Sequence, residues 1–269
     1  MTGNAAFVGQ VPEFYDRGLG PFLFEHYAEE MAARTAALKP RRVLETAAGT
    51  GIVTRQLRKL LPRTTELTVT DLNTPMLEIA KAKFAADSGV AFAQADAQEL
   101  SFPDSSFDAV VCQFGIMFYP DKPKSFRETH RVLVPGGTYL FSVWDAHAYN
   151  PFGRIVHEVA ARFFPKDPPP FYKIPFGTHS IDAVKTMLHE ASFGGIRVEV
   201  LAHDSPVADL SSLARSAVFG NPFGDQVRER GGDPEAVIAA VEKDLAAAFG
   251  TKPRPVPMQT IFFTASKPR

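Results

Sequence analysis

The chain has little cysteine, almost no net charge and no long hydrophobic run. Cys112 is the one cysteine among 269 residues, which excludes an internal disulfide and a cysteine-rich zinc site. The 29 basic and 30 acidic residues leave a net charge of −1. That balance gives no general attraction to a phosphate backbone and argues against a nucleic-acid partner.

Membrane and export signals are also missing. No apolar run approaches the roughly 18 residues that a spanning helix needs. The first ten residues lack the basic and apolar regions of a signal peptide. We therefore expect a cytoplasmic protein with no integral membrane segment and no bound metal. The oligomeric state is left open by the composition.

Phenylalanine is abundant instead. The chain holds 23 Phe against 6 Tyr and one Trp, together with 22 Pro, and its apolar fraction is 45%. This apolar fraction is too high for a disordered chain. Phenylalanine supplies a large apolar face without a polar group, so the excess predicts either a Phe-rich core or an apolar pocket.

Strand and helix patterns alternate along the chain, which predicts an α/β fold with a Rossmann-like, doubly wound, mainly parallel sheet. Seven strands are predicted, at 42–45, 66–70, 90–94, 107–112, 138–144, 195–201 and 258–264. The predicted helices lie at 21–38, 52–61, 74–86, 122–133, 181–192, 209–218 and 234–248. We expect one domain over 1–269, with an N-terminal arm and helix at 1–38 and helical insertions at 145–180 and 203–256 forming a cap.

Three features fall where the first three strands end. The turn between strand 42–45 and its helix contains Gly49 and Gly51, and small residues there let the backbone approach a ligand closely. Asp71 follows the second strand, where a carboxylate can accept from ribose hydroxyls. Asp96 follows the third and can accept from an adenine amine. Each aspartate alone is equally explained as a turn residue or helix cap, but the ordered set predicts an adenosine ligand.

A dinucleotide is less well matched than a mononucleoside. The dinucleotide fingerprint has a third glycine, whereas Thr54 follows Gly51 at the corresponding spacing. A phosphate-binding Gly-Lys-Ser/Thr loop is also missing from the sequence. A nicotinamide-dependent oxidoreductase stays as an alternative, as does a non-catalytic cofactor-binding protein.

The motifs resemble those of a known family. They are Glu45-x-Ala-x-Gly-x-Gly51, Asp71, Ala95-Asp96-Ala97-x-x-Leu-x-Phe-Pro-Asp104, Phe107-Asp108-Ala109-Val-Val111 and Val132-Leu-x-Pro-Gly-Gly137. Together they are similar to class I S-adenosylmethionine-dependent methyltransferases, and most to the small-molecule branch that includes ubiquinone/menaquinone-biosynthesis methyltransferases. Ala47 departs from the pattern, because the family usually has its first glycine there. We expect the added methyl group to tune affinity for the cofactor.

The resemblance implies a role for each matching residue. The loop from Glu45 through Thr46, Ala47 and Gly49 to Gly51 would hold the methionine part of S-adenosyl-L-methionine. Asp71 would hold the ribose, and the adenine would lie near Leu72, Met76, Asp96 and Ala97. Gln113 and Phe114 would line the methyl-donor end, and Tyr15 would close over the cofactor. Arg34 either reaches the cofactor carboxylate or lies on the helix surface.

The predicted activity is in-line methyl transfer to a small, apolar or aromatic metabolite. The sulfonium leaves as a neutral thioether, so holding the acceptor and methyl group in line supplies most of the catalysis. A general base is needed only if the acceptor must lose a proton. His147, with Tyr149 nearby, is the candidate base, since the pKa of histidine lies near neutrality. A surface loop position is the favoured interpretation of His147, because nothing else in the sequence pairs with it.

Overall fold

The fold is a seven-stranded sheet flanked by helices, seen here in a computed structural model that describes residues 7, 9–86, 88–251 and 255–269. The strands are β1 (Arg42–Glu45), β2 (Glu66–Asp71), β3 (Val90–Gln94), β4 (Phe107–Gln113), β5 (Leu133–Trp144), β6 (Gly194–Ser205) and β7 (Val256–Ser266). Their order in the sheet is β3-β2-β1-β4-β5-β7-β6. All neighbours from β3 to β5 are parallel, and β7 runs antiparallel to both β5 and β6. The predicted mainly parallel sheet is confirmed.

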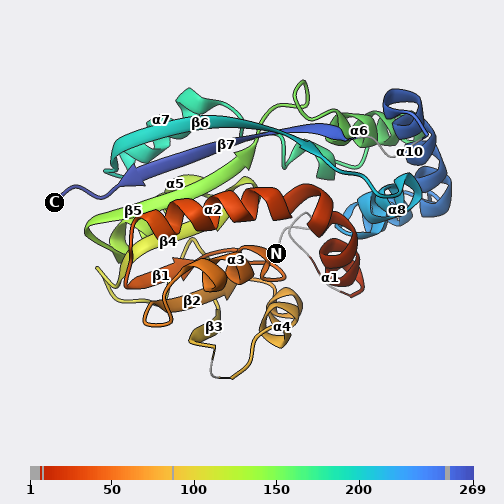
Figure 1. Ribbon diagram of the computed structural model, residues 1–269. Helices are drawn as coiled ribbons and strands as arrows, with labels where there is room; N and C mark the ends of the chain where they lie inside the picture. The colour runs from red at the N-terminus through yellow and green to blue at the C-terminus, as the bar shows by residue number, and fades with distance from the viewer. Residues whose placement is uncertain (1–6, 8, 87, 252–254) are drawn as a thin grey trace.

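The helices and helical turns separate into those beside the sheet and those beyond one end of it (Figure 1). They are α1 (Val11–Phe14), η2 (Tyr15–Phe24), α2 (Glu25–Ala37), α3 (Ile52–Leu60), α4 (Thr74–Ala82), η3 (Ile116–Phe118), α5 (Lys122–Val132), α6 (Pro151–Phe163), η4 (Phe171–Lys173), α7 (Ile181–Glu190), α8 (Leu210–Phe219), α9 (Phe223–Glu229) and α10 (Pro234–Phe249). In Figure 1, α6, α8 and α10 gather beyond one end of the sheet, next to α1.

The topology places a ligand site between β1 and β4. The chain moves outward from β1 to β2 and β3 on one side, and to β4 and β5 on the other. Ligands of open α/β sheets bind beyond the carboxyl ends of the strands at such a switch point. The buried strand centre, including Val43, Leu44 and Val110, supports the loops that leave these strand ends.

The N-terminal segment differs from the prediction of one helix at 21–38. A ten-residue π-helix, η2, precedes α2 and contains Pro21. Its wider turn is invisible to a search for a 3.6-residue period, and π-helical turns occur frequently at functional sites. Tyr15 therefore begins a helical segment and does not lie in an extended arm.

The insertion at 145–180 also holds more regular structure than expected. Its proline content obscured α6, because Pro151 stands in the first turn of that helix and Pro165 follows its end. Proline is tolerated at both places and excluded only from the helix interior. Helix α9 was missed as well, since its seven residues are too few to show a clear period.

Strand β5 begins at Leu133, five residues before the predicted strand at 138–144. Gly136 has a φ of +82°, and the pairing of β5 with β4 shifts between Phe107 and Ala109. An irregularity of this kind bends a strand without ending it. The strand therefore continues through the glycine pair.

Candidate functional site

A cavity of about 370 Å³ lies beyond the carboxyl ends of the parallel strands. This volume falls within the roughly 300–1,000 Å³ of small-molecule sites. Ten of the predicted site residues line it: Tyr15, Ala47, Gly49, Asp71, Leu72, Met76, Asp96, Ala97, Gln113 and Phe114. The sheet thus brings motifs that are far apart in the sequence together in one wall of the cavity.

The loop after β1 meets the cavity with its smallest residues. Backbone hydrogen bonds from Thr46 to Val111 and from Ala48 to Thr70 tie this loop to both neighbouring strands at 3.0 Å. Gly49 has a φ of +57°, which suits glycine because it has no Cβ. Gly51, with a φ of +80°, instead faces α4, where a Cβ would lie 2.9 Å from that of Ala80. Gly51 therefore permits close helix packing behind the cavity.

Ala47 keeps the backbone geometry of a glycine. Its φ is +51°, a left-handed conformation that costs an L-residue roughly 1–2 kcal/mol. The added methyl group fills a space that Gly115 leaves open, since a Cβ on Gly115 would lie 2.5 Å from that of Ala47. The departure from the family pattern is therefore accommodated by a glycine on the facing loop.

Asp71 joins two of the loops around the cavity. One carboxylate oxygen accepts from the Gly49 amide at 2.8 Å, and the other accepts from the Asn73 amide at 2.7 Å. Burial raises the pKa of this carboxyl group, and the surrounding amides act against that rise. An acceptor that faces the cavity and is already held by two loops is fixed in position before a ligand arrives.

Glu45 lies behind the same loop. The side chain is 1% exposed, and one oxygen accepts from the Thr54 hydroxyl at 2.7 Å. Its other oxygen is buried without a partner in the described structure. Burial, assisted by the charge of Asp71, raises the pKa of Glu45 to about 8. Glu45 is therefore largely protonated at neutral pH and supports the loop from inside.

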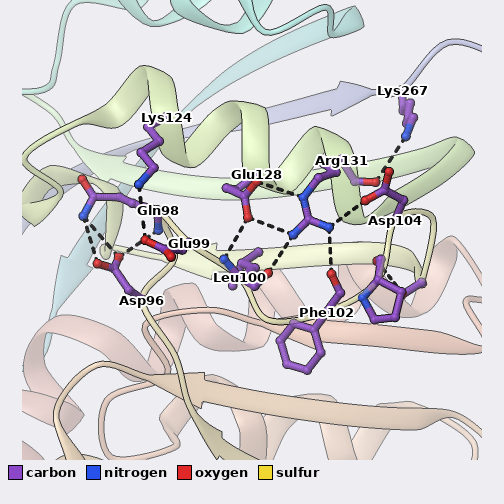
Figure 2. Close-up of polar contacts among 12 residues, drawn as sticks. Asp96, Gln98, Glu99, Leu100, Phe102, Asp104, Lys124, Glu128, Arg131 and Lys267 are labelled. Carbon is purple, nitrogen blue, oxygen red and sulfur yellow. Dashed lines mark hydrogen bonds and ion pairs between the residues drawn. The ribbon is translucent and has the colours of Figure 1, made fainter.

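Asp96 is positioned by a short turn. One carboxylate oxygen accepts from the Gln98 amide at 2.8 Å and from the Gln98 side chain at 3.1 Å. Figure 2 shows this pair beside Glu99, which approaches Lys124 on α5. The turn leaves Asp96 at the cavity wall next to Ala97.

Arg131 anchors the rest of the loop from Asp96 to Phe107. Its guanidinium donates to the carbonyls of Leu100 and Phe102, both at 2.7 Å, and pairs with Asp104 and Glu128 (Figure 2). Glu128 also accepts from the Leu100 amide at 2.8 Å. The planar, five-donor geometry of arginine suits such a multiple anchor. These contacts tie the acidic and apolar residues of the motif from Ala95 to Asp104 to the C-terminal end of α5.

Gln113 and Phe114 form the floor of the cavity at the end of β4. The Gln113 amide nitrogen donates to the Phe24 carbonyl at 3.2 Å, while its amide oxygen is buried without a partner among the described residues. Phe114 stacks on Trp144 with ring centroids 4.0 Å apart. The floor therefore combines one free hydrogen-bond acceptor with a flat aromatic surface.

The opposite half of the cavity is aromatic and comes mainly from the N-terminal segment and the first insertion. Its rings belong to Phe7, Phe24, Phe118, Phe152, Phe171, Tyr172 and Phe176. Phe118 stacks with Phe171 at 6.0 Å, and Phe7 meets both edge-on. The phenylalanine excess thus lines the cavity as well as filling the core.

Tyr15 bridges the two halves. Its ring stacks on Phe24 at 4.8 Å, and its hydroxyl would lie 3.9 Å from a Cβ on Gly49. Burial and the charge of Asp71 raise the pKa of this phenol. The hydroxyl therefore stays protonated and can donate a hydrogen bond across the Gly49 loop.

Several predicted residues lie elsewhere. Thr46, like Glu45 and Gly51, is not part of the cavity lining, so the prediction that the whole loop faces the ligand is corrected to its central residues. The Nε2 atom of His147 is hydrogen-bonded to the Tyr172 carbonyl oxygen at 2.9 Å. Tyr149 is 55% exposed. Neither lines the cavity. The structure therefore gives no support to either as a general base.

Arg34 does not reach the cavity. Its guanidinium pairs with Glu199 on β6 and lies 5.0 Å from the centroid of the Phe262 ring. The ion pair and the aromatic contact hold it on the outer surface of α2. The helix-surface interpretation is the correct one.

Some lining residues were missed from the sequence. Asn73 is 8% exposed, and its side-chain oxygen has no partner in the described structure. Its position two residues after Asp71 was the available signal. The aromatic residues of the first insertion carried no motif and are recognisable only once the chain is folded.

The described residues show neither a cluster of metal ligands nor a membrane-spanning helix. Among the described residues, no group of three or more metal-ligating side chains comes together. No helix in the described part of the chain has the length and apolar character to cross a bilayer.

Comparison with known proteins places residues 43–137 in a family described as a methyltransferase domain. Ubiquinone/menaquinone biosynthesis C-methyltransferase UbiE of Psychromonas ingrahamii is 33% identical over 132 residues, which are 48% of this chain and 52% of that protein. The chain thus spans about half the length of the curated relatives it matches.

Solved structures show the same fold. The YcgJ protein of Bacillus subtilis aligns with a TM-score of 0.59 at 20% identity, covering 91% of this chain and 99% of that one. The [4+2]-cyclase SpnF aligns with a TM-score of 0.52 at 20% identity, covering 91% and 81%. Residues 43–137 thus match a methyltransferase domain, and the strand order and the strand-end cavity agree with that match.

Proposed function

We propose that this protein is an enzyme that transfers a methyl group from S-adenosyl-L-methionine to a small, apolar or aromatic metabolite. The observation that carries the proposal is the cavity in which Gly49, Asp71 and Asp96 lie side by side with an aromatic chamber. Its polar half suits a nucleoside, and its apolar half suits an acceptor. The family match makes this a better account than a nicotinamide-dependent oxidoreductase.

The hydrogen-bonding groups of the cavity fit this cofactor. The buried side-chain atoms without a partner in its described lining are oxygen acceptors, on Asn73 and Gln113. Asp71 and Asp96 add carboxylate acceptors. Ribose hydroxyls, the adenine amine and the ammonium group of S-adenosylmethionine are the matching donors, and a buried acceptor is costly until it meets one.

Each lining residue has a proposed role. Asp71 would accept from the ribose hydroxyls, and Asp96 from the adenine amine. Leu72, Met76 and Ala97 would pack against the adenine ring. The central loop residues Ala47 and Gly49 would face the methionine part, with Glu45, Thr46 and Gly51 supporting the loop from behind. Gln113, Phe114 and Tyr15 would surround the methyl-donor end.

These residues would act by position. The cofactor supplies an electrophilic methyl group whose leaving sulfur departs neutral. The chain would hold the acceptor in line at about 3–3.5 Å, which can supply most of the rate enhancement. Aromatic faces around the methyl-donor end favour a cation and exclude water.

Most of the acceptor half lies outside the matched family segment. Residues 43–137 carry the loops for the cofactor, whereas Trp144, Phe152 and Phe171 follow that segment. The substrate of the matched UbiE proteins, named for quinone biosynthesis, is therefore only one option for this chain.

Calorimetry with S-adenosylhomocysteine tests the proposal. We expect saturable binding in the micromolar range, with one ligand per chain. Asp71→Ala should weaken binding by about 1–3 kcal/mol, because a buried hydrogen-bond acceptor is lost. Asp182→Asn, an exposed change on α7, is the control and should bind like the parent protein. No heat of binding at high micromolar ligand would refute the proposal, and an unchanged affinity for Asp71→Ala would remove this residue from the site.

A further inference from the structure

The cavity also restricts the chemistry of the acceptor. We propose that the acceptor is a flat, hydrophobic molecule whose nucleophile is an uncharged nitrogen, so that the methylated product is a nitrogen cation. This inference rests on the methyltransferase function proposed above. It deepens that function by naming the acceptor class.

The first argument is the sign of charge around the cavity. Among the described lining residues, Asp71 and Asp96 are the acidic side chains, and no lysine, arginine or histidine is present. The raised pKa of Asp71 reflects burial, and a cation beside it would favour its ionised form. An anionic acceptor would meet no opposite charge on the protein, and desolvating it without one is costly. The lining therefore tolerates a neutral or cationic acceptor and disfavours an anion.

The second argument is that no lining group is suited to remove a proton from the acceptor. The Asp71 oxygens accept from Gly49 and Asn73, and one Asp96 oxygen accepts from Gln98. Burial raises the pKa of the phenols of Tyr15 and Tyr172. A phenol or a hydroquinone carbon becomes a strong nucleophile only as a proton leaves. An amine or aromatic nitrogen attacks with its own lone pair and needs no base.

The third argument is the ring geometry of the acceptor half. Phe118 and Phe171 stack at 6.0 Å, and Trp144 lies 6.3 Å from Phe176. Phe152 meets Tyr172 edge-on at 6.3 Å. Aromatic faces attract cations, with tryptophan the strongest partner. The chamber therefore stabilises positive charge as it moves from the sulfur to the acceptor.

The reaction balances without another reagent. The nitrogen lone pair forms the new N–C bond, the C–S bond breaks, and its electron pair stays on sulfur. S-adenosylhomocysteine leaves with a neutral thioether, and the nitrogen carries the positive charge. If that nitrogen still bears hydrogen, the proton passes to water after product release.

The test uses two-ring probes of equal shape and opposite charge. N-methylisoquinolinium, a cation, and 2-naphthoate, an anion, are each titrated into the protein saturated with S-adenosylhomocysteine. Trp144 is the sole tryptophan and lines the cavity, so quenching of its fluorescence reports binding at the site. We expect saturable quenching by the cation with a Kd at least about tenfold lower than that of the anion, from the opposite sign of their interaction with the carboxylates.

A variant assigns the preference to the cavity. Phe171→Leu, which removes one aromatic face from the acceptor half, should reduce the ratio of the two Kd values, whereas the exposed control Asp182→Asn should leave it unchanged. Equal binding of the probes, tighter binding of 2-naphthoate, or no saturable quenching by the cation would overturn the inference while leaving the methyltransferase function in place. Failure of S-adenosylhomocysteine itself to bind would overturn the proposed function, and this inference with it.

Discussion

At the scale of single residues, the sequence located the polar wall of the cavity because positions such as Gly49 and Asp71 there have a backbone reason. Gly49 needs its positive φ, and Asp71 connects two loops through their amides. Such constraints leave a motif in the sequence. Asn73 and Gln113 leave a weaker signal, because an unpartnered oxygen is a property of three-dimensional surroundings.

Ala47 and Gly115 form a packing pair that can be tested by a double-mutant cycle. Gly115→Ala should destabilise the protein by about 1–3 kcal/mol, because its new methyl group would overlap the methyl group of Ala47 and the sulfur of Cys112. Ala47→Gly should recover part of that loss, since it removes one of the two obstacles. Urea unfolding of the two single variants and the double variant measures the coupling. Strictly additive effects would show that the two methyl positions do not interact.

The raised pKa of Glu45 predicts that the stability of the protein depends on pH. Its pKa is raised to about 8 in the folded protein, against about 4.3 in an unfolded chain. Between these values the folded state binds the extra proton, so this group lowers stability as pH rises from about 5 to 8. Glu45→Gln, which cannot ionise, should flatten that part of the profile. Urea midpoints measured across this range would contradict the account if parent and variant run parallel.

At the scale of elements, the strands were predicted correctly, whereas two helical segments with unusual period or proline content were not. All seven strands lie where alternation and turn residues placed them, although β5, β6 and β7 extend further. The π-helix η2 has no 3.6-residue period. Helix α6 was hidden by prolines that in fact mark its start and the residues after its end.

A polar clamp holds η2 against the β1 loop. The ammonium of Lys83 contacts Asp16 and the Thr50 carbonyl, at 2.5 and 2.8 Å, and the Thr50 hydroxyl donates to Asp16 at 2.6 Å. Because η2 brings Tyr15 and Phe24 to the cavity, the clamp couples the N-terminal segment to the cofactor loop.

Lys83→Met should loosen this segment. We expect faster amide hydrogen exchange in residues 15–24, since opening free energies follow local contacts, and about two- to tenfold weaker binding of S-adenosylhomocysteine, which corresponds to losing about 0.4–1.4 kcal/mol. Lys81→Met, on the exposed side of α4, is the matched control. Unchanged exchange in both variants would show that packing alone holds η2 in place.

At the scale of the whole molecule, one sheet brings together two parts with different origins in the sequence. The polar wall of the cavity, which we propose holds the cofactor, comes from the strand ends of a recognisable domain at 43–137. The aromatic half, which we propose holds the acceptor, comes mainly from the N-terminal segment, η3, the end of β5 and the residues after it. The first part was predictable residue by residue. The second was predictable only as an apolar tendency, because phenylalanine serves a packed core and a substrate chamber equally well.

A crystal structure with S-adenosylhomocysteine bound tests the central claim most directly. The account predicts the ribose at Asp71, the adenine between Met76 and Asp96, and the sulfur facing Gln113 and the aromatic chamber. A ligand bound elsewhere, or with its sulfur directed away from the chamber, would contradict it.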